Sequence, residues 1–220
     1  MKYQCIIFDC DGVLVDSLSL SNRIMLELIK PFKISDEFEK IIDNYNGGSL
    51  KASLDKIEEL MNEELPKDFV QKYRKLTYEI FRKKLQPVKG ITEFIKKIDI
   101  PICVASSGPR EKIIENLKTT NLLKYFRGSI FSSYDIQSWK PEPGIFIHAA
   151  NKMGFKPQEC VVIEDSIDGI QAALSRGFNI IGLATESNFE MMNKTQAMVF
   201  KSIPEIEKAV IKKANVNNDA

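Results

Sequence analysis

Short runs of apolar residues recur along this chain and predict the strands of a sheet. They cover residues 5–8, 102–105, 129–131, 161–163, 179–183 and 197–200. The runs are continuous rather than alternating, and segments of helical period lie between most of them, at residues 109–117, 143–153 and 166–176. Continuous apolar strands separated by helices are typical of a parallel sheet that helices cover on both faces. The pattern therefore predicts an α/β fold.

The exception is the stretch from residue 17 to about residue 86, which carries helical patterns only. They lie at residues 18–30, 36–43, 49–61 and 66–85. This is far more helix than one crossover needs, so we expect a small helical bundle inserted on two linkers, residues 15–18 and 85–90. The predicted domains are an α/β core of residues 1–15 and 87–220 and an inserted helical domain of residues 16–86.

Composition and charge limit the possible partners. The 220 residues include 31 Lys and Arg against 30 Asp and Glu, and 44% are hydrophobic. This composition is that of a globular protein, which excludes disordered, collagen-like and disulfide-scaffold classes. A net charge of +1 gives no basic surface for nucleic acid or anionic membrane, so we expect neither as a partner.

The cysteines and the chain start bear on the compartment. The four cysteines are scattered without a C-x-x-C pair, and three lie within or beside apolar runs, which predicts free, buried thiols in a reducing compartment. The first apolar run is too short for a signal sequence, and none approaches a membrane span. We therefore expect a soluble, cytoplasmic protein.

Two pairs of carboxylates directly follow predicted strands. Asp9 and Asp11 come after the first strand, and Glu164 and Asp165 come after the fourth. Ligands of parallel α/β sheets bind at the carboxyl ends of the strands, and carboxylates beside a substrate phosphate suit Mg²⁺. A surface turn at the first pair, or a helix start with acids in its first turn at the second, would need no ligand.

A hydroxyl-bearing segment follows the second strand. Ser106, Ser107 and Gly108 precede Pro109 at a predicted helix start, where exposed backbone N–H groups suit a phosphate. A serine here could equally be a plain helix N-cap.

A lysine lies in a proline-rich segment further along. Pro141 and Pro143 predict an extended backbone that presents Lys140 from a stiff loop, where its ammonium could neutralise a phosphoryl group. The alternative is a solvated loop lysine.

Along the chain these candidate residues occur in the order acid pair, hydroxyl, lysine and acid pair. In this order the chain resembles the haloacid dehalogenase superfamily of phosphotransferases. It resembles most the subfamily that carries a helical cap between the first two motifs. The matching segments are residues 8–17, 106–109, 140–143 and 164–169. The resemblance is closest to bacterial 6-phosphogluconate phosphatases, above all at residues 134–143, and to β-phosphoglucomutase-like proteins. It implies a Rossmann-like parallel sheet core with an inserted helical-bundle cap domain.

The resemblance also implies roles for the residues that match its motifs. Asp9 would be the nucleophile that becomes an aspartyl phosphate, and Asp11 the general acid and base. Ser106, with the backbone N–H groups of Ser107 and Gly108, would hold the transferring oxygens.

The same resemblance implies a cation and a metal ion at the site. Lys140 would neutralise the phosphate. Mg²⁺ would be held by Asp9, the backbone carbonyl of Asp11 and Asp165. Glu164 would either bind the ion as a further ligand or contact the residues that bind it.

The inserted domain contains a segment at the position of the family's substrate-specificity loop. It offers Asn46, Gly47, Gly48, Ser49 and Lys51 between two predicted helices. Amides and hydroxyls suit a polyol, and a single cation suits a carboxylate. A simple helix–helix turn is the alternative, because Asn and Gly are common turn residues.

The expected function is a Mg²⁺-dependent phosphatase acting on a small phosphorylated metabolite, such as the sugar acid 6-phosphogluconate, as a monomer or weak homodimer. One alternative is a β-phosphoglucomutase-like phosphomutase with the same motifs. Another, from a different class, is a non-catalytic receiver-like phosphoacceptor, which also places acids, a hydroxyl and a lysine on a parallel sheet.

Overall fold

The core of the molecule is a parallel sheet. The computed structural model describes residues 3–32 and 50–215, and within them six strands pair in the order β3-β2-β1-β4-β5-β6, every neighbouring pair parallel. The strands are β1 (Cys5–Phe8), β2 (Ile102–Ser106), β3 (Ile130–Ser132), β4 (Cys160–Glu164), β5 (Asn179–Leu183) and β6 (Met198–Phe200). All six lie where the apolar runs predict them, so the α/β expectation is confirmed.

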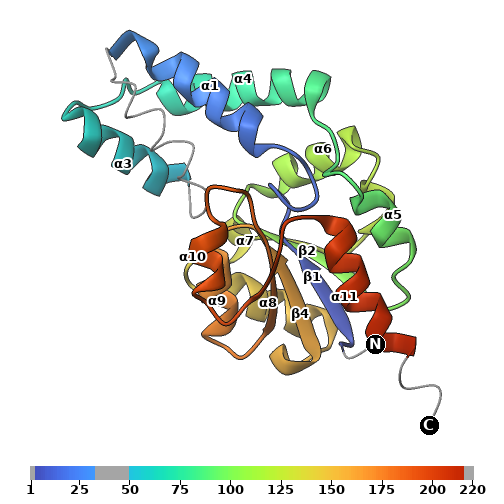
Figure 1. Ribbon diagram of the computed structural model, residues 1–220. Coiled ribbons are helices and arrows are strands. Elements are labelled where there is room, and N and C mark those ends of the chain that lie inside the picture. Colours follow the sequence, from blue (N-terminus) through green and yellow to red (C-terminus); the bar gives the residue numbers. More distant parts are fainter. Residues whose placement is uncertain (1–2, 33–49, 216–220) are drawn as a thin grey trace.

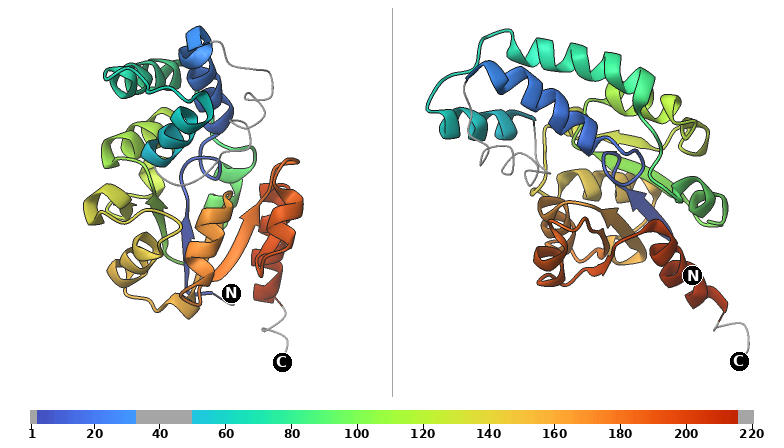
Figure 2. Two further views of the ribbon diagram at one scale, coloured as in Figure 1. Left: turned by 90° about the vertical axis from the view of Figure 1, so that its left-hand side faces the viewer. Right: turned by 45° about the horizontal axis from the view of Figure 1, so that its top comes forward.

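Helices cover both faces of this sheet (Figures 1 and 2). They are α5 (Ile91–Lys96), α6 (Arg110–Thr119), α7 (Ser133–Ile136), α8 (Gly144–Met153), α9 (Ile167–Leu174), α10 (Phe189–Asn193) and α11 (Ile203–Asn215). Short 3-10 turns are η1 (Lys30–Phe32), η2 (Leu123–Tyr125) and η3 (Pro157–Glu159). The helical patterns predict α6, α8 and α9 but miss the other four helices.

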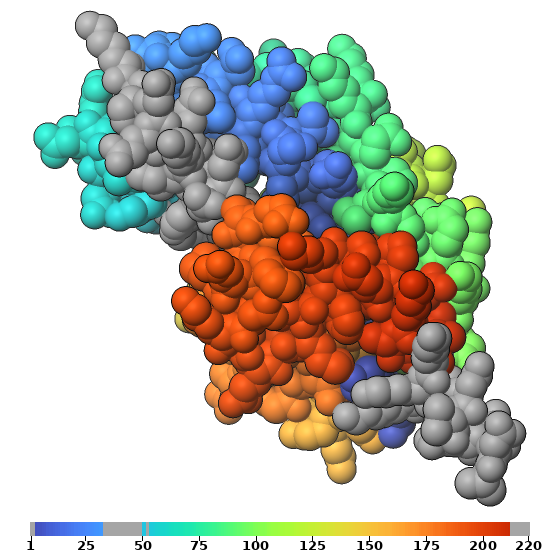
Figure 3. Space-filling view, in the orientation of Figure 1, coloured from blue at the N-terminus to red at the C-terminus, as the bar shows by residue number. Residues whose placement is uncertain are grey.

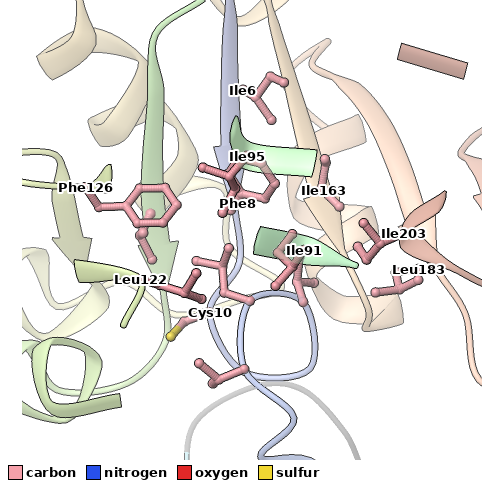
Figure 4. Close-up of a cluster of buried hydrophobic side chains, with 14 of the residues drawn as sticks. Ile6, Phe8, Cys10, Ile91, Ile95, Leu122, Phe126, Ile163, Leu183 and Ile203 are labelled. Atoms are coloured by element: carbon pink, nitrogen blue, oxygen red, sulfur yellow. The ribbon is translucent and has the colours of Figure 1, made fainter. Parts of the chain in front are cut away.

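Alternate residues of each strand point to opposite faces of the sheet, and each face has its own apolar core. On one face Ile6 and Phe8 are fully buried, and the ring of Phe8 meets Phe126 edge-on with centroids 6.0 Å apart (Figure 4). The same ring meets Phe94 of α5 edge-on at 6.2 Å. On the other face Ile7 packs with residues of α8 and α9. The continuous apolar strands are thus explained by burial on both sides.

The four cysteines lie in these cores. Cys5, Cys10, Cys103 and Cys160 are all buried and free, as the sequence predicts. Hydrogen bonding between neighbouring thiols, with burial added, raises the pKa of Cys5 and Cys160, and burial raises that of Cys10. These are therefore inert core side chains.

The inserted segment, residues 16–86, is mainly helical in the part of it that the structure describes, as its patterns predict. Its helices are α1 (Leu18–Ile29), α3 (Leu50–Met61) and α4 (Phe69–Lys84), and they lie over the carboxyl ends of the strands (Figure 1). They share a separate apolar cluster of Met25, Ile29, Leu54, Ile57 and Phe69. The predicted helix at residues 36–43 lies outside the described residues. That this segment is a domain of its own stays a prediction.

The two linkers of the inserted segment run side by side. The backbone N–H of Asp16 donates to the carbonyl of Gln86 at 2.9 Å, and that of Val88 donates to the carbonyl of Leu14 at 3.1 Å. The chain therefore enters and leaves the inserted helices at one place. In the space-filling view a narrow opening separates the start of this segment (blue) from the core residues after β4 (orange) (Figure 3).

Within residues 3–32 and 50–215, no helix is both long and apolar enough to cross a membrane.

Candidate active site

Four of the strands end in polar residues at the same edge of the sheet. Asp9 directly follows β1, and β2, β3 and β4 end in Ser106, Ser132 and Glu164. The backbone N–H of Asp9 donates to the carbonyl of Ile163, which ties the end of β1 to β4. The strand pairing therefore brings the predicted site residues to one place.

Lys140 lies between two acids from different strands. Its ammonium donates to Oδ1 of Asp9 at 2.5 Å and to Oε1 of Glu164, and it is also 5.1 Å from the ring centroid of Phe146. Burial alone would lower the pKa of Lys140, but the two carboxylates outweigh burial and raise it above its usual value. The side chain is therefore a fixed, buried cation, as the site prediction requires.

The backbone around Lys140 corrects one expectation. The N–H of Glu142 donates to the carbonyl of Trp139 at 2.9 Å, so Lys140 lies in a turn rather than in an extended loop. The Lys140–Pro141 peptide bond is cis, and Pro143 has helical dihedral angles because it directly precedes α8. The lysine is fixed by this turn and by its ion pairs.

Glu164 is held by the backbone that follows it. Its Oε2 accepts the N–H groups of Asp165 at 2.6 Å and Ser166 at 2.8 Å, and the Ser166 hydroxyl at 3.0 Å. A Cβ at Gly169 would collide with this carboxylate, so a side chain there would displace it. Ser166 also caps α9, because its Oγ accepts the Gly169 N–H at 3.1 Å. The N-cap is therefore present, and it leaves the prediction of an acidic site open because Glu164 lies before the cap.

Asp9, Glu164 and Asp165 form a buried acidic cluster. Each offers a carboxylate oxygen, and these oxygens lie within 4.8 Å of one another. Burial raises the pKa of Asp9 to about 7, and Glu164 adds to the rise while Lys140 opposes it. Burial, Glu164 and Asp9 likewise raise the pKa of Asp165 well above its usual value. One lysine does not balance three close acids, so the cluster suits a bound divalent cation.

Space beside this cluster is kept open by a glycine. Gly12 has a φ of +83°, and a Cβ there would collide with the carboxylate of Asp165. A larger residue would both strain the backbone and push Asp165 aside.

The turn after β2 has a different role from a plain helix cap. Pro109, not a serine, occupies the N-cap position of α6, while Oγ of Ser106 accepts the N–H of Gly108 at 3.2 Å. Ser132 fixes the turn from β3 by donating to the carbonyl of Gly108 at 2.6 Å. The buried hydroxyl oxygen of Ser107 has no protein partner among the described residues. This leaves polar groups at the position predicted for phosphate binding.

Asp11 is held by three side chains that the sequence does not single out. Its Oδ2 accepts from Lys112 of α6 at 2.7 Å, and its Oδ1 accepts from the Ser17 hydroxyl at 2.6 Å and from Asn116 at 3.4 Å. Burial alone raises the pKa of Asp11, but Lys112 and Ser17 outweigh burial and hold it below its usual value. These donors therefore favour the carboxylate form of Asp11.

The predicted specificity loop is only partly described. Lys51 lies on α3, its side chain is 82% exposed, and its ammonium pairs with Asp55 one turn on at 2.6 Å. The other four candidates lie outside the described residues: Asn46, Gly47, Gly48 and Ser49. The loop's role in selectivity therefore stays a prediction.

The inserted helices also contact the core beside the lysine turn. Arg74 of α4 donates to the hydroxyl of Tyr134 at 3.3 Å, and the ring of Tyr134 meets Trp139 edge-on at 5.3 Å. Trp139 thus packs in an aromatic pair next to Lys140.

Sequence reasoning missed the residues that orient the site, chiefly Ser17, Lys112 and Ser132. Ser17 is 6 positions from Asp11 and ends the matching segment 8–17, but that segment assigned it no role, whereas Lys112 is 101 positions away and lies in no matching segment. The available signals were weak: a serine just before α1, a lysine in the first turn of α6 and a serine at the end of β3.

Fold and site together define an α/β enzyme whose reactive groups gather at the carboxyl ends of its strands. A family model described as haloacid dehalogenase-like hydrolase matches residues 6–183, so the chain belongs to this family. Within the family, the chain is a phosphoric monoester hydrolase, as the names of its relatives indicate.

Among the relatives named as phosphatases are two whose names specify a phosphorylated carbohydrate or sugar acid. The 6-phosphogluconate phosphatase of Escherichia coli is 28% identical over 94% of this chain and 96% of its own length. The phosphorylated carbohydrates phosphatase of Thermotoga maritima is 29% identical over 81% of this chain and 83% of its own length. Among solved structures, a haloacid dehalogenase-like protein of unknown function from Agrobacterium tumefaciens matches with a TM-score of 0.84 at 26% identity, over 96% of this chain and 99% of its own.

Proposed function

We propose that this protein is a Mg²⁺-dependent phosphatase that hydrolyses a small phosphorylated metabolite through an aspartyl phosphate on Asp9. One observation carries the proposal: the buried cluster of Asp9, Glu164 and Asp165, with a single lysine, lies at the strand ends beside a turn that suits a phosphate. A carboxylate can approach a phosphate dianion only where nearby cations offset the repulsion.

The donor set suits Mg²⁺. Asp9, Asp165 and the backbone carbonyl of Asp11 would hold the ion, while Glu164 would stay behind them, because both its oxygens already accept protein donors. When bound, Mg²⁺ polarises the phosphoryl oxygens and offsets the charge that develops on them. Glu164 would then fix Lys140 and the loop after β4 rather than bind the metal itself.

In the first half of the reaction, an oxygen of Asp9 attacks phosphorus as the ester P–O bond breaks. Lys140, the hydroxyl of Ser106 and the N–H of Ser107 stabilise the transferring oxygens. The N–H of Gly108 holds Oγ of Ser106 in place. The departing oxygen takes its proton from Asp11, which must carry a proton at that moment. The products are an aspartyl phosphate at Asp9 and a free alcohol.

In the second half, water attacks the phosphorus of the aspartyl phosphate. Asp11, now a carboxylate, takes the proton from this water as the bond between phosphorus and Asp9 breaks. Inorganic phosphate leaves and Asp9 is restored. The same side chain thus serves as acid and then as base.

The substrate that we propose is a phosphorylated sugar or sugar acid, of which 6-phosphogluconate is the leading candidate. The names of the two phosphatase relatives support this class. The core groups contact only the phosphate, so selection of the organic part falls to the inserted helices and to the loop with Asn46, Gly47, Gly48, Ser49 and Lys51.

We further propose that residues 16–86 form a cap that opens for substrate and closes to exclude water. Both linkers meet at one backbone pairing, which gives the segment a single hinge. Its own apolar cluster would let it move as a unit.

The test is phosphate release from a panel of phosphorylated metabolites with Mg²⁺, with EDTA, and with Mg²⁺ restored. We expect sugar phosphates or sugar acid phosphates to be the best substrates, EDTA to abolish turnover and Mg²⁺ to restore it. Asp9→Asn should be inactive, whereas the matched control Asp99→Asn, at an exposed core position, should retain activity. Full activity without metal would contradict the proposal, and a preference for nucleotides would contradict the substrate class alone.

The same panel separates a phosphatase from a phosphomutase. A mutase needs a bisphosphate activator and releases no net phosphate, whereas the proposed enzyme releases one phosphate for each substrate consumed. Stoichiometric isomerisation without phosphate release would establish the mutase.

A further inference from the structure

Lys112 occupies a position between the catalytic edge of the core and the inserted helices. It lies on α6, a core helix that packs against α4. Its ammonium is 2.7 Å from Oδ2 of Asp11 and 5.7 Å from the ring centroid of Phe81, which is a buried residue of α4. The side chain therefore contacts the proposed acid and base on one side and the proposed cap on the other.

The same lysine borders the phosphate-binding turn. A Cβ built on Gly108 would lie 3.6 Å from Oγ of Ser106, 3.9 Å from Oδ2 of Asp11 and 3.6 Å from Cδ of Lys112. Ser106, Asp11 and the aliphatic part of Lys112 therefore all lie next to the same side of Gly108. Asp11 lies against the turn at the point where Lys112 holds it.

The other carboxylate oxygen of Asp11 is fixed independently. Oδ1 accepts the hydroxyl of Ser17, which directly precedes α1 at the start of the inserted segment. Asn116 adds a longer contact to Oδ1 at 3.4 Å. Among the described residues, Lys112 is the one side chain that donates to Oδ2, so its loss removes the anchor of that oxygen. Proton transfer depends on such placement, because donor and acceptor must come within hydrogen-bond distance.

We propose that Lys112 is a positioning residue for Asp11: it holds the carboxylate against the phosphate-binding turn and links that placement to the cap through Phe81. The inference rests on the proposed function, since it assigns Asp11 the proton of the leaving group. Lys112 itself takes no part in bond making or breaking.

The test compares two esters that differ in their need for a proton. An alkyl phosphate leaves as a strongly basic alkoxide, whereas 4-nitrophenyl phosphate leaves as a stable phenolate that needs little protonation. Lys112→Met keeps the apolar stem and removes the ammonium. We expect its kcat to fall at least about tenfold more with glycerol phosphate than with 4-nitrophenyl phosphate, within the about 10²–10⁴-fold that general acid catalysis provides.

Three further variants make this test specific. Lys112→Arg restores a cation and should recover most of the lost rate with the alkyl ester. Lys118→Met makes the same change at an exposed position of the same helix and should leave both rates unchanged. Phe81→Leu should lower kcat less than Lys112→Met does. Its effect should again be greater with the alkyl ester than with 4-nitrophenyl phosphate. If Lys112→Met fails to fold, Lys112→Arg and Phe81→Leu carry the test.

Equal losses with both esters in Lys112→Met would show a merely structural role and overturn the inference. Equal losses in Phe81→Leu would overturn the link to the cap. If instead the unaltered protein releases phosphate from neither these esters nor any member of the metabolite panel, or if Asp11→Asn shows no leaving-group dependence, the proposed function fails and the inference fails with it.

Discussion

The catalytic edge of the core and the inserted helices are built in different ways. At the core edge the ionised groups are buried and paired: the side chain of Lys140 is 3% exposed and lies between Asp9 and Glu164. In the inserted helices the ion pairs are exposed, as in the pair of Lys51 with Asp55, whose side chains are 82% and 55% exposed.

This difference indicates that the reaction depends on the core edge, whereas the choice of substrate depends on the inserted helices. Breaking a buried pair leaves an uncompensated charge and is strongly destabilising, so the core edge tolerates little change. Exposed pairs contribute about 0–1 kcal/mol each, so the surface of the inserted helices can vary at low cost. The core edge would bind the phosphate in the same way in every substrate. The inserted helices could vary to accept different organic parts of the substrate.

The largest effect should come from Asp9→Asn, which tests the core side of the comparison. Asn cannot form the aspartyl phosphate, so steady-state phosphate release should fall to the background rate. The fold should survive, because the change removes one of three mutually repelling acids and Lys140 keeps its buried ion pair with Glu164. Thermal unfolding should therefore show an unchanged or higher Tm. A Tm far below that of the unaltered protein would mean that lost activity reflects lost structure.

Asp11→Asn should have the next largest effect. Without a group that gives and takes a proton, kcat for an alkyl phosphate should fall by about 10²–10⁴-fold. The measurement is kcat for alkyl and 4-nitrophenyl esters side by side. A reduction below threefold for the alkyl ester would remove Asp11 from the proposed mechanism.

A paired substitution tests whether the inserted helices are a separate unit. Ile57→Ala, in the small apolar cluster of that segment, should cost about 2–5 kcal/mol, and Phe8→Ala in the main core about 3–5 kcal/mol. In the first variant, hydrogen exchange should accelerate in α1, α3 and α4 and not in the core. In the second variant it should accelerate throughout the core. Equal acceleration everywhere in Ile57→Ala would show a single cooperative unit and contradict the domain prediction.

The acidic cluster predicts how the stability of the metal-free protein depends on pH. The pKa of Asp9 is about 7 in the folded protein and about 4 in the unfolded chain, so the unfolded state binds fewer protons between these values. The contribution of Asp9 to the free energy of unfolding should therefore fall as pH rises from about 4 to 7. The difference in Tm between the unaltered protein and Asp9→Asn isolates this contribution.

Mg²⁺ should reverse that trend, because the ion offsets the ionised carboxylates. The expected result is a rise in Tm on adding Mg²⁺ that is larger at pH 7 than at pH 5. A metal-free protein in which Asp9 stabilises the fold more strongly at higher pH would contradict this account of the cluster.

The smallest effect on stability should come from Lys51→Ala. An exposed pair one helical turn apart contributes about 0.3–0.5 kcal/mol, so Tm should hardly change. If the loop selects the substrate, the ratio of kcat/KM for an acidic sugar phosphate to that for a neutral one should fall. Lys56→Ala, which breaks another exposed pair on α3, is the control and should leave the ratio unchanged. An unchanged ratio in Lys51→Ala would exclude this lysine from selectivity.

The strands and the acids could be predicted from the sequence because both signals are local. β1 and β5 lie at the residues of their apolar runs, since burial on both faces makes a strand continuously apolar. Asp9, Asp11, Glu164 and Asp165 follow strands directly, and strand ends of a parallel sheet meet at one edge.

The residues that orient the site could not be predicted in this way, because they contact the site residues from distant positions in the sequence. Lys112 is recognised only when α6 is placed beside Asp11, and Ser132 only when β3 pairs with β2. The helix α11 did leave a signal that went unused: Ile203, Ile206 and Val210 are buried at helical spacing, and Pro204 lies in its first turn.

The central claim is that Asp9 carries the phosphoryl group, and trapping that group is the most direct test. Acid quenching during turnover of a radiolabelled substrate, followed by peptide mass spectrometry with and without hydroxylamine, locates the phosphoryl group. The account predicts a hydroxylamine-sensitive phosphate on the peptide with Asp9, absent in Asp9→Asn. A phosphoryl group on any other residue, or an equally labelled Asp9→Asn protein, would contradict it.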